Sequence, residues 1–172
     1  MTVHDVRIEV TPLQTEGMRD VRGDVVRRQL IADHGVDVGI VRSICGYLIR
    51  SQYDASSIAP RVQDIFSDPI IEFGAVDTPL IHDSNFFPQT PSLCVTIGFK
   101  PGVTDNPGAA ANDGFQVLFP DINAAISTYT TYVFTDLPET VDNAWLASTL
   151  HNPLIERAIL VTRDNLSSGN DS

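Results

Sequence analysis

Short apolar stretches of strand character alternate along this chain with amphipathic stretches of helical character. Residues 6–12 place Val, Ile and Val at every second position, which predicts a half-buried strand. From Asp20 to His34 the apolar positions recur at helical spacing, and Gly35 follows where a helix C-cap is expected. Residues 38–51 are rich in Val and Ile without a helical period, and predict a long strand. The chain therefore opens with the order strand, helix, strand.

Two further elements complete a first unit. A helix is predicted from the Ser56-Ser57 capping region through Phe66, with Pro60 in its first turn, where a missing N–H costs little. Asp68-Pro69 ends this helix, and residues 70–76 predict a third strand. The same order then returns as a strand over 93–99, a turn over 100–104, a helix over 107–119, a strand over 122–135, a helix over 138–151 and a strand over 154–161.

The two units are separated by a segment of different composition. Residues 78–91 contain three prolines and no consistent period, which predicts a linker anchored to the body by Phe86 and Phe87. Residues 164–172 have the polar composition of a tail or of the start of a linker to a following domain. We therefore divide the chain into a first unit over 1–77, the linker over 78–91, a second unit over 92–163 and the polar end over 164–172.

The two units share motifs at a nearly constant offset. The segments Ser67-Asp68-Pro69-Ile70-Ile71-Glu72 and His151-Asn152-Pro153-Leu154-Ile155-Glu156 lie 84 residues apart, and the Asp-x-x-Gly of residues 20–23 returns at 105–108. Self-similarity at a fixed offset indicates a repeat, so we expect a tandem duplication of a β-α-β-α-β unit. A unit of roughly 75 residues is marginal alone. We therefore predict an α+β fold whose two units share an interface, with helices packed on an antiparallel sheet.

The charge balance limits the classes of partner that the chain is expected to bind. The formal net charge is -11, with 8 basic and 13 acidic residues before position 85 and 3 and 9 after it. Such an acidic chain is a poor match for nucleic acid or for an anionic membrane. No signal peptide or membrane span is predicted, so we expect a cytoplasmic protein. Cys45 and Cys94 fall in strand-like runs and are expected to be buried thiols.

The sequence offers little recognisable chemistry. The four histidines lack metal-ligand spacing, and no phosphate-binding loop, dinucleotide-binding motif or nucleophile elbow occurs. His34 and His151 stand at predicted helix ends, where a protonated ring interacts favourably with the helix dipole. Four arginines are expected on the solvated face of the first helix, namely Arg19, Arg22, Arg27 and Arg28. We predict no catalytic or metal-binding residue.

The stretch from Lys100 to Gly108 is the most distinctive in the chain. Pro101-Gly102 predicts a turn, and either Asp105 or Asn106 is suited to cap a helix that begins at Pro107. Capping alone accounts for these two polar residues. The N-terminus of such a helix could also receive an anion or the carboxylate of a partner.

The order of these motifs resembles the PurS small subunit of phosphoribosylformylglycinamidine (FGAM) synthase. The resemblance rests on Pro-Gly-Val-x-Asp-x-x-Gly opening a helix and on Asn-Pro-Leu-Ile-Glu before the last strand, and it covers about residues 5–162. The first unit departs from it at 15–18, where Thr-Glu-Gly-Met replaces the expected lysine-glycine turn. A tandem pair in one chain resembles the N-terminal domain of the single-chain enzyme, in which two PurS-like halves form a pseudo-dimer.

The resemblance implies a non-catalytic assembly domain in purine biosynthesis. Such a domain bridges the ATP-dependent synthetase part and the glutaminase part, in cis or in trans, and holds no cofactor itself, because ATP and Mg bind to the synthetase part. The chain would then be a component of an ATP- and glutamine-dependent ligase. We expect its partner contacts at the two Asp-x-x-Gly turns, namely at Asp20, Gly23, Pro101, Gly102, Thr104, Asp105, Asn106 and Gly108.

Two other functions are compatible with the same sequence. One is a tandem regulatory domain that binds a small molecule, such as an amino acid or a nucleotide, between its two units. The other is an independent enzyme with an active site between the halves, which the lack of clustered His, Asp and Glu residues makes the weaker hypothesis. The motifs leave open whether the chain is a separate subunit or the N-terminal piece of a longer protein.

Overall fold

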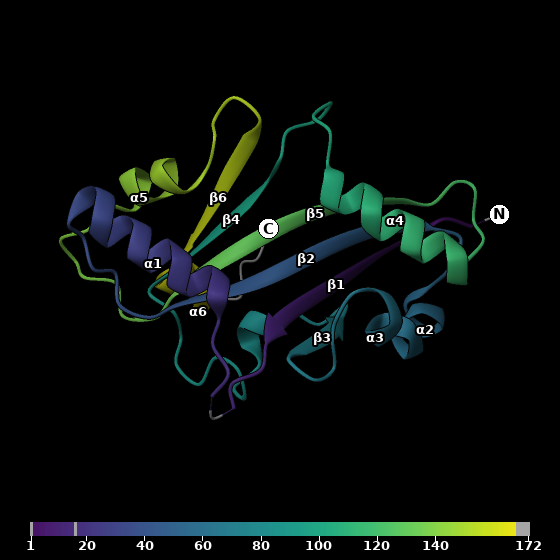
Figure 1. Ribbon diagram of the computed structural model, residues 1–172, viewed down its shortest axis with the longest axis horizontal. Coiled ribbons are helices and arrows are strands. Elements are labelled where there is room, and N and C mark those ends of the chain that lie inside the picture. The colour runs from purple at the N-terminus through teal and green to yellow at the C-terminus, as the bar shows by residue number, and fades with distance from the viewer. Residues whose placement is uncertain (1, 16, 168–172) are drawn as a thin grey trace.

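One six-stranded antiparallel sheet forms the centre of the computed structural model, which describes residues 2–15 and 17–167 (Figure 1). The strands are β1 (His4–Pro12), β2 (Val41–Ser51), β3 (Glu72–Val76), β4 (Leu93–Phe99), β5 (Ala125–Phe134) and β6 (Glu156–Thr162). The helices are α1 (Val21–His34), α2 (Ala55–Ile58), α3 (Val62–Ile65), α4 (Asn106–Leu118), α5 (Asn143–Leu150) and α6 (Arg163–Ser167), with 3-10 turns η1 (Ala59–Arg61) and η2 (Leu80–His82).

The strand order is β3-β1-β2-β5-β4-β6, and neighbouring strands are antiparallel throughout. The central pair, β2 with β5, takes one strand from each half of the chain and runs over ten paired positions from Val41↔Phe134 to Arg50↔Ala125. This confirms the α+β class and the antiparallel sheet. It also places both halves in a single sheet rather than in two separate ones.

The first strand and first helix form where the periodicity predicts them. Asp20 is the N-cap of α1, and Gly35 closes the helix in the left-handed conformation, with φ of 68°. A residue without Cβ takes this conformation at little cost, which explains the glycine. The second strand begins at Val41 and not at 38, because Gly39 also has a positive φ, of 71°, and its N–H donates to the side chain of Asp37.

The helix predicted over 56–66 is broken into α2, η1 and α3. Pro60 lies in η1, where it lacks the N–H that a continuous α-helix would need. The N-cap is Asp54 and not Ser56 or Ser57: its carboxylate accepts from the N–H of Ser57 at 2.9 Å and from both serine hydroxyls. The following strand, β3, starts at Glu72, because the residues just before it form a turn closed by bonds to the carbonyl of Asp68.

The second half follows its prediction closely until α5. The strand β4 has the predicted bounds, and α4 begins at Asn106 with Asp105 as its N-cap. The helix predicted over 138–151 is shorter, since Pro138 to Val141 forms a separate turn and α5 starts only after Asp142. Asp142 caps it by accepting from the N–H of Trp145 at 2.7 Å. A local capping residue therefore overrides the longer apolar pattern.

One face of the sheet is covered by helices, and each cover draws on both halves. In the first cluster, α1 and α5 pack on β4 and on the ends of β2 and β5. In the second cluster, α4 packs with α2 and α3 on β1 and on the other ends of β2 and β5. Figure 1 shows α1 and α4 lying over opposite ends of the central strands. Because helices of each half cover strands of the other, separating the halves would expose both clusters.

The opposite face is only partly covered, by the linker and by α6. Leu80, Phe87 and Leu166 are buried there against Ile44 and Val133, and the ring of Phe86 stacks on that of Phe73 at 4.9 Å. The prediction that Phe86 and Phe87 anchor the linker is confirmed. The polar end expected over 164–172 is corrected for residues 164–167, which belong to α6 because Leu166 has an apolar surface to pack on. Residues 168–172 lie outside the described part of the chain.

Both cysteines are thiols, as the sequence predicts, with Cys94 buried and Cys45 half-buried. His34, at the end of α1, packs its ring edge-on against Trp145 of α5, with ring centroids 5.2 Å apart. His151 follows α5 and its Nδ1 lies 2.6 Å from the carbonyl oxygen of Ala147. The two histidines at helix ends thus have packing and capping contacts within the fold.

Candidate interaction surface

The N-terminus of α1 is tied to β2 through the side chain of Asp20. Its Oδ1 accepts from the N–H of Gly23 at 2.9 Å and from the hydroxyl of Ser43 at 2.8 Å, and its Oδ2 accepts from the N–H of Ser43 at 2.5 Å. Asp20 is only 6% exposed, and a buried carboxylate needs such bonds to remain buried. We call Asp20, Gly23 and Ser43 the α1 latch.

The N-terminus of α4 carries the same arrangement on β5. Asp105 Oδ1 accepts from the N–H of Gly108 at 2.7 Å and from the hydroxyl of Thr128 at 2.9 Å, and Oδ2 accepts from the N–H of Thr128 at 2.6 Å. Of the two residues proposed as the cap, it is therefore Asp105 that caps, and Asn106 is the first helical residue. We call Asp105, Gly108 and Thr128 the α4 latch.

The glycine of each latch allows the helix to approach its strand. A Cβ on Gly23 would lie 2.0 Å from the carbonyl oxygen of Val41, and a Cβ on Gly108 would lie 2.6 Å from that of Ile126. Both distances are far inside normal contact, and the obstructing atoms belong to the backbone of the sheet. The Asp-x-x-Gly motif is therefore explained by structure: the aspartate fixes the helix start, and the glycine makes room for the strand.

The second shared motif forms the same turn in both halves. The N–H groups of Ile71 and Glu72 donate to the carbonyl of Asp68, and those of Ile155 and Glu156 donate to the carbonyl of Asn152. In each turn the glutamate side chain reaches back to the first N–H, from Glu72 to Asp68 at 3.0 Å and from Glu156 to Asn152 at 2.7 Å. The turn then enters an edge strand, β3 or β6.

A cleft of about 230 Å³ lies on the helix-covered face, over the middle of the β2–β5 pair. Its floor contains the facing pair Cys45 and Thr130, with Tyr47 and Tyr132 on either side. Arg22, in the first turn of α1, and Glu156, at the start of β6, also line it. Burial raises the pKa of the Cys45 thiol and of both phenols, so these groups are neutral at pH 7.

A larger groove, of about 900 Å³, lies on the opposite face of the sheet. Its apolar floor includes Leu48 and Ile159, which are 48% and 52% exposed. Arg7, Lys100 and Arg157 line it as well, and the last two are among the three basic residues that follow position 85. The groove thus combines exposed apolar surface with positive charge in a chain that is acidic overall.

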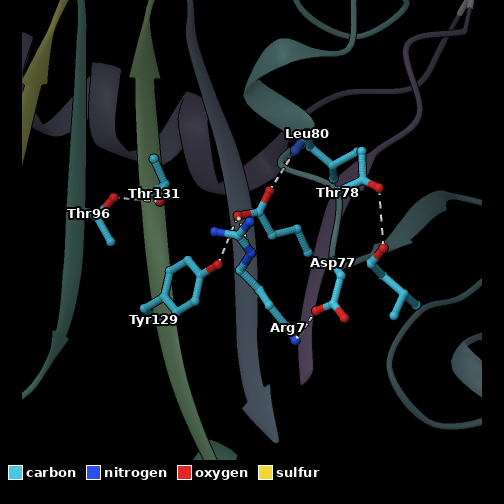
Figure 2. Close-up of polar contacts among 9 residues, drawn as sticks. Arg7, Asp77, Thr78, Leu80, Thr96, Tyr129 and Thr131 are labelled. Atoms are coloured by element: carbon cyan, nitrogen blue, oxygen red, sulfur yellow. Dashed lines mark hydrogen bonds and ion pairs between the residues drawn. The ribbon is translucent and has the colours of Figure 1, made fainter. Parts of the chain in front are cut away.

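A buried glutamate joins the two halves beside this groove. Glu9 of β1, 8% exposed, accepts from the hydroxyl of Tyr129 of β5 at 2.9 Å and from the N–H of Leu80 at 2.7 Å. Figure 2 shows Tyr129 reaching across from its strand while Leu80 approaches from the linker. Arg7 adds an ion pair at 4.0 Å. The bonds fix the linker and both halves at one point.

The ring of Tyr129 takes the space above a glycine on the neighbouring strand. A Cβ on Gly46 would lie 1.9 Å from the Tyr129 ring, so only glycine fits at that position. Burial first, and then the charge of Glu9, raise the pKa of Tyr129 above its usual value. The phenol is therefore a hydrogen-bond donor at neutral pH. On the same face Thr96 and Thr131 share a hydrogen bond of 2.8 Å, also drawn in Figure 2.

The predicted contact residues fall into two groups. Asp20, Gly23 and Gly108 are buried in the latches and do not line the groove. The others lie at the rim of the groove or on exposed parts of the same turn: Pro101, Gly102 and Asp105 line the groove, and Thr104 and Asn106 are exposed beside it. The structure brings these turn residues together with Arg7 and Arg157. Whether they contact a partner stays a prediction.

Sequence reasoning missed the Glu9–Tyr129 bridge. Glu9 occupies a polar position of an alternating strand, which the pattern assigns to solvent, and nothing local marks it as buried. The one available signal was Gly46, a glycine inside a strand, which often marks the close approach of another group. That group is the ring of Tyr129, 83 residues further along the chain.

Within residues 2–15 and 17–167, no group of three or more His, Cys, Asp or Glu side chains is placed to hold a metal ion. None of the helices in that same part of the chain is long and apolar enough to cross a membrane. Comparison with protein-family models and with curated protein sequences gives no match.

Proposed function

We propose that this chain is a non-catalytic assembly domain of FGAM synthase, built as a tandem duplication of a PurS-like unit, and acts in the cytoplasm in purine biosynthesis. The observation that carries the proposal is the pairing of two motifs in each half. The Asp-x-x-Gly latch and the turn closed by a glutamate occur in the same order, with the same hydrogen bonds, in both halves of the chain. These are the motifs on which the resemblance to the PurS subunit rests.

The arrangement of the halves supports the pseudo-dimer. Order β3-β1-β2 on one side of the sheet is repeated as β6-β4-β5 on the other, and the two central strands meet as antiparallel neighbours. Antiparallel pairing of equivalent strands is what a two-fold relation between two copies would produce. A duplicated unit that must bury its helices against the other copy also explains the mixed helical covers.

Under this proposal the groove on the open face is the surface that receives the synthetase or glutaminase part. Exposed apolar side chains together with separate positive charges suit a protein surface that carries apolar and acidic groups. The turn from Lys100 to Asp105 forms one rim, so the predicted contact residues Pro101, Gly102 and Asp105 belong to the same surface. ATP and Mg would remain with the synthetase part.

Reconstitution tests the proposal directly. Synthase activity is measured with glutamine and with ammonia as nitrogen source, in a mixture of the synthetase and glutaminase parts with and without this chain. A bridging role predicts that omission abolishes the glutamine-dependent rate and leaves more of the ammonia-dependent rate. Equal rates with and without the chain, from both nitrogen sources, would reject the role.

A charge reversal connects the activity to the groove. Arg157→Glu should weaken co-purification with the partner parts and reduce the glutamine-dependent rate, because the exposed Arg157 side chain lines the groove. Arg28→Glu is the matched control, since it makes the same charge change on an exposed part of α1 away from the groove. Equal effects of the two variants would show that overall charge, and not the groove, governs assembly.

The alternative of a tandem small-molecule-binding regulatory domain is favoured by a different observation. The cleft above the β2–β5 pair lies between the two halves, where such a domain would hold its ligand. Its test, ligand binding by the isolated chain, is independent of the reconstitution. Either function can therefore be rejected without affecting the other.

A further inference from the structure

The cleft on the helix-covered face carries opposite charges together with several neutral hydrogen-bonding groups. Arg22 and Glu156 come from different halves and both line it. Both charges act on Tyr132: Arg22 lowers the pKa of this phenol and Glu156 raises it, although burial has the largest effect. The two charged groups therefore lie near one phenol, in a cleft open to solvent.

The cleft-lining groups keep unused hydrogen-bonding capacity. Among the contacts of the described residues, the guanidinium of Arg22 has no ion pair and the hydroxyls of Tyr47, Thr130 and Tyr132 have no hydrogen bond. Glu156 uses Oε2 to accept from Asn152 and keeps Oε1 available. An arginine can bind a carboxylate through two parallel N–H bonds, and a carboxylate oxygen can accept from an ammonium group. The cleft offers both.

Size and wall chemistry limit the ligand. A volume of about 230 Å³ is below the range of roughly 300–1,000 Å³ found for sites that hold drug-sized molecules. Ile97, Phe99 and Leu150 supply an apolar wall beside the polar floor. A nucleotide is therefore too large, whereas a molecule with a carboxylate, an ammonium group and a short side chain fits the available groups.

We propose that this cleft binds a free α-amino acid, with its carboxylate on Arg22 and its ammonium group on Glu156. The phenols of Tyr47 and Tyr132 and the hydroxyl of Thr130 complete the polar contacts, and the short side chain lies against the apolar wall. The two charges come from α1 of the first half and β6 of the second, so binding would couple the halves. This proposal develops the regulatory alternative and does not depend on the assembly role.

Isothermal titration calorimetry of the intact chain tests the site. The probes are L-alanine, L-serine and L-glutamine, with propionate and propylamine as analogues that keep only one of the two charges. We expect saturable heat from at least one amino acid and none from the analogues, because each analogue can pair with only one of the two charges, Arg22 or Glu156. Absence of saturable heat from all three amino acids at millimolar concentration would overturn the proposal, as would equal binding of propionate.

Variants assign the binding to the cleft. Arg22→Met should weaken amino-acid binding about ten-fold or more, the effect of losing a charge-assisted hydrogen bond. Arg28→Met is the matched control, because it removes an exposed arginine of the same helix that does not line the cleft, and it should bind like the unaltered chain. Equal affinity of Arg22→Met and the unaltered chain would place the ligand elsewhere and reject the site.

Chemical-shift mapping gives a readout that does not depend on folding of the variants. On titration with the binding amino acid, the amide signals of Tyr47, Thr130 and Tyr132 should shift, while those of the groove residues Thr96 and Ile159 should not. Shifts confined to the groove would contradict the proposal, even if the calorimetry showed binding.

Discussion

The two latches have the same pattern of hydrogen bonds but differ in how deeply they are buried. Asp20 is 6% exposed in the α1 latch, whereas Asp105 in the α4 latch is half-buried and lines the groove of the opposite face. The glycines differ in the same direction, with a Cβ on Gly23 meeting the strand at 2.0 Å and one on Gly108 at 2.6 Å. The same motif therefore forms a buried latch in the first half and a latch beside an open surface in the second.

This difference teaches that a repeated motif need not have a repeated role. A buried latch contributes mainly to stability, because its polar groups cannot reach water if a hydrogen-bond partner is lost. A latch beside solvent can replace a lost partner with water. It therefore tolerates substitution better and is available for contacts outside the chain. The following predictions test this comparison from the largest expected effect to the smallest.

Adding a methyl group to the two glycines should give the largest and most unequal effects. We expect Gly23→Ala to lower the free energy of unfolding by about 3 kcal/mol and Gly108→Ala by about 2 kcal/mol, because each Cβ meets a backbone carbonyl of the sheet. Urea denaturation measures both. Equal losses would show that the two latches are packed equally tightly, and would contradict the proposed difference between them.

Removing the two capping carboxylates should give the next largest effects. Asp20→Ala leaves the N–H groups of Gly23 and Ser43 without partners in a buried place, and should lower the free energy of unfolding by about 2 kcal/mol. Asp105→Ala should lower it by about 1 kcal/mol, since Asp105 and its partner Thr128 are only partly buried. Thermal and urea unfolding of both variants measure these two losses of stability. A larger loss from Asp105→Ala than from Asp20→Ala would contradict the prediction.

The link between the halves should respond to high pH. The pKa of Tyr129 is raised in the folded state, so its stabilisation is complete below the unfolded pKa of about 10 and is lost as pH rises above that value. Tyr129→Phe should lower the free energy of unfolding by about 1 kcal/mol at pH 7 and should flatten the loss of stability above pH 10. Urea denaturation of both proteins across this pH range measures the free energy of unfolding. If Tyr129→Phe loses stability above pH 10 as steeply as the unaltered chain, Tyr129 is not the cause of that loss.

An exposed ion pair between α1 and the loop that follows it should have the smallest effect. Arg27 binds Asp37 through two bonds of 2.8 Å and, with the N–H of Gly39, lowers the pKa of Asp37 to about 2. The stabilisation is present above the unfolded pKa of about 3.9 and is lost as pH falls toward 2. Because both side chains are solvated, Asp37→Asn should leave the urea midpoint at pH 7 unchanged within error. A clear shift would show that solvated pairs matter here as much as buried caps.

Local chemistry allowed much of the fold to be predicted from the sequence. The strand over 93–99, the helix ending at Gly35 and the shared Asp-x-x-Gly and glutamate turns all depend on residues within a few positions of one another. The errors arose where a choice between local options was needed, as at Asp54 for the second helix and Asp142 for α5. A better cap nearby moved the helix start in each case.

The candidate site was harder to predict, because its residues meet only after folding. The turn from Lys100 to Asp105 was recognised, but nothing in the sequence joined it to Arg7, to Arg157 or to the bridge between Glu9 and Tyr129. Arg22 and Glu156, which both line the cleft, are also far apart in the sequence and come together only in the fold. Such long-range partners leave no periodic pattern.

The sequence by itself determined most of the elements and the motifs that the two halves share, because periodicity, capping and turn formation act over a few residues. Only the tertiary structure decided that each half's helices cover strands of the other half, that Leu166 brings α6 onto the open face, and that one latch is buried while the other borders a groove. Those features depend on which surfaces meet when the β2–β5 pair forms. Burial is a property of that whole arrangement and of no single segment.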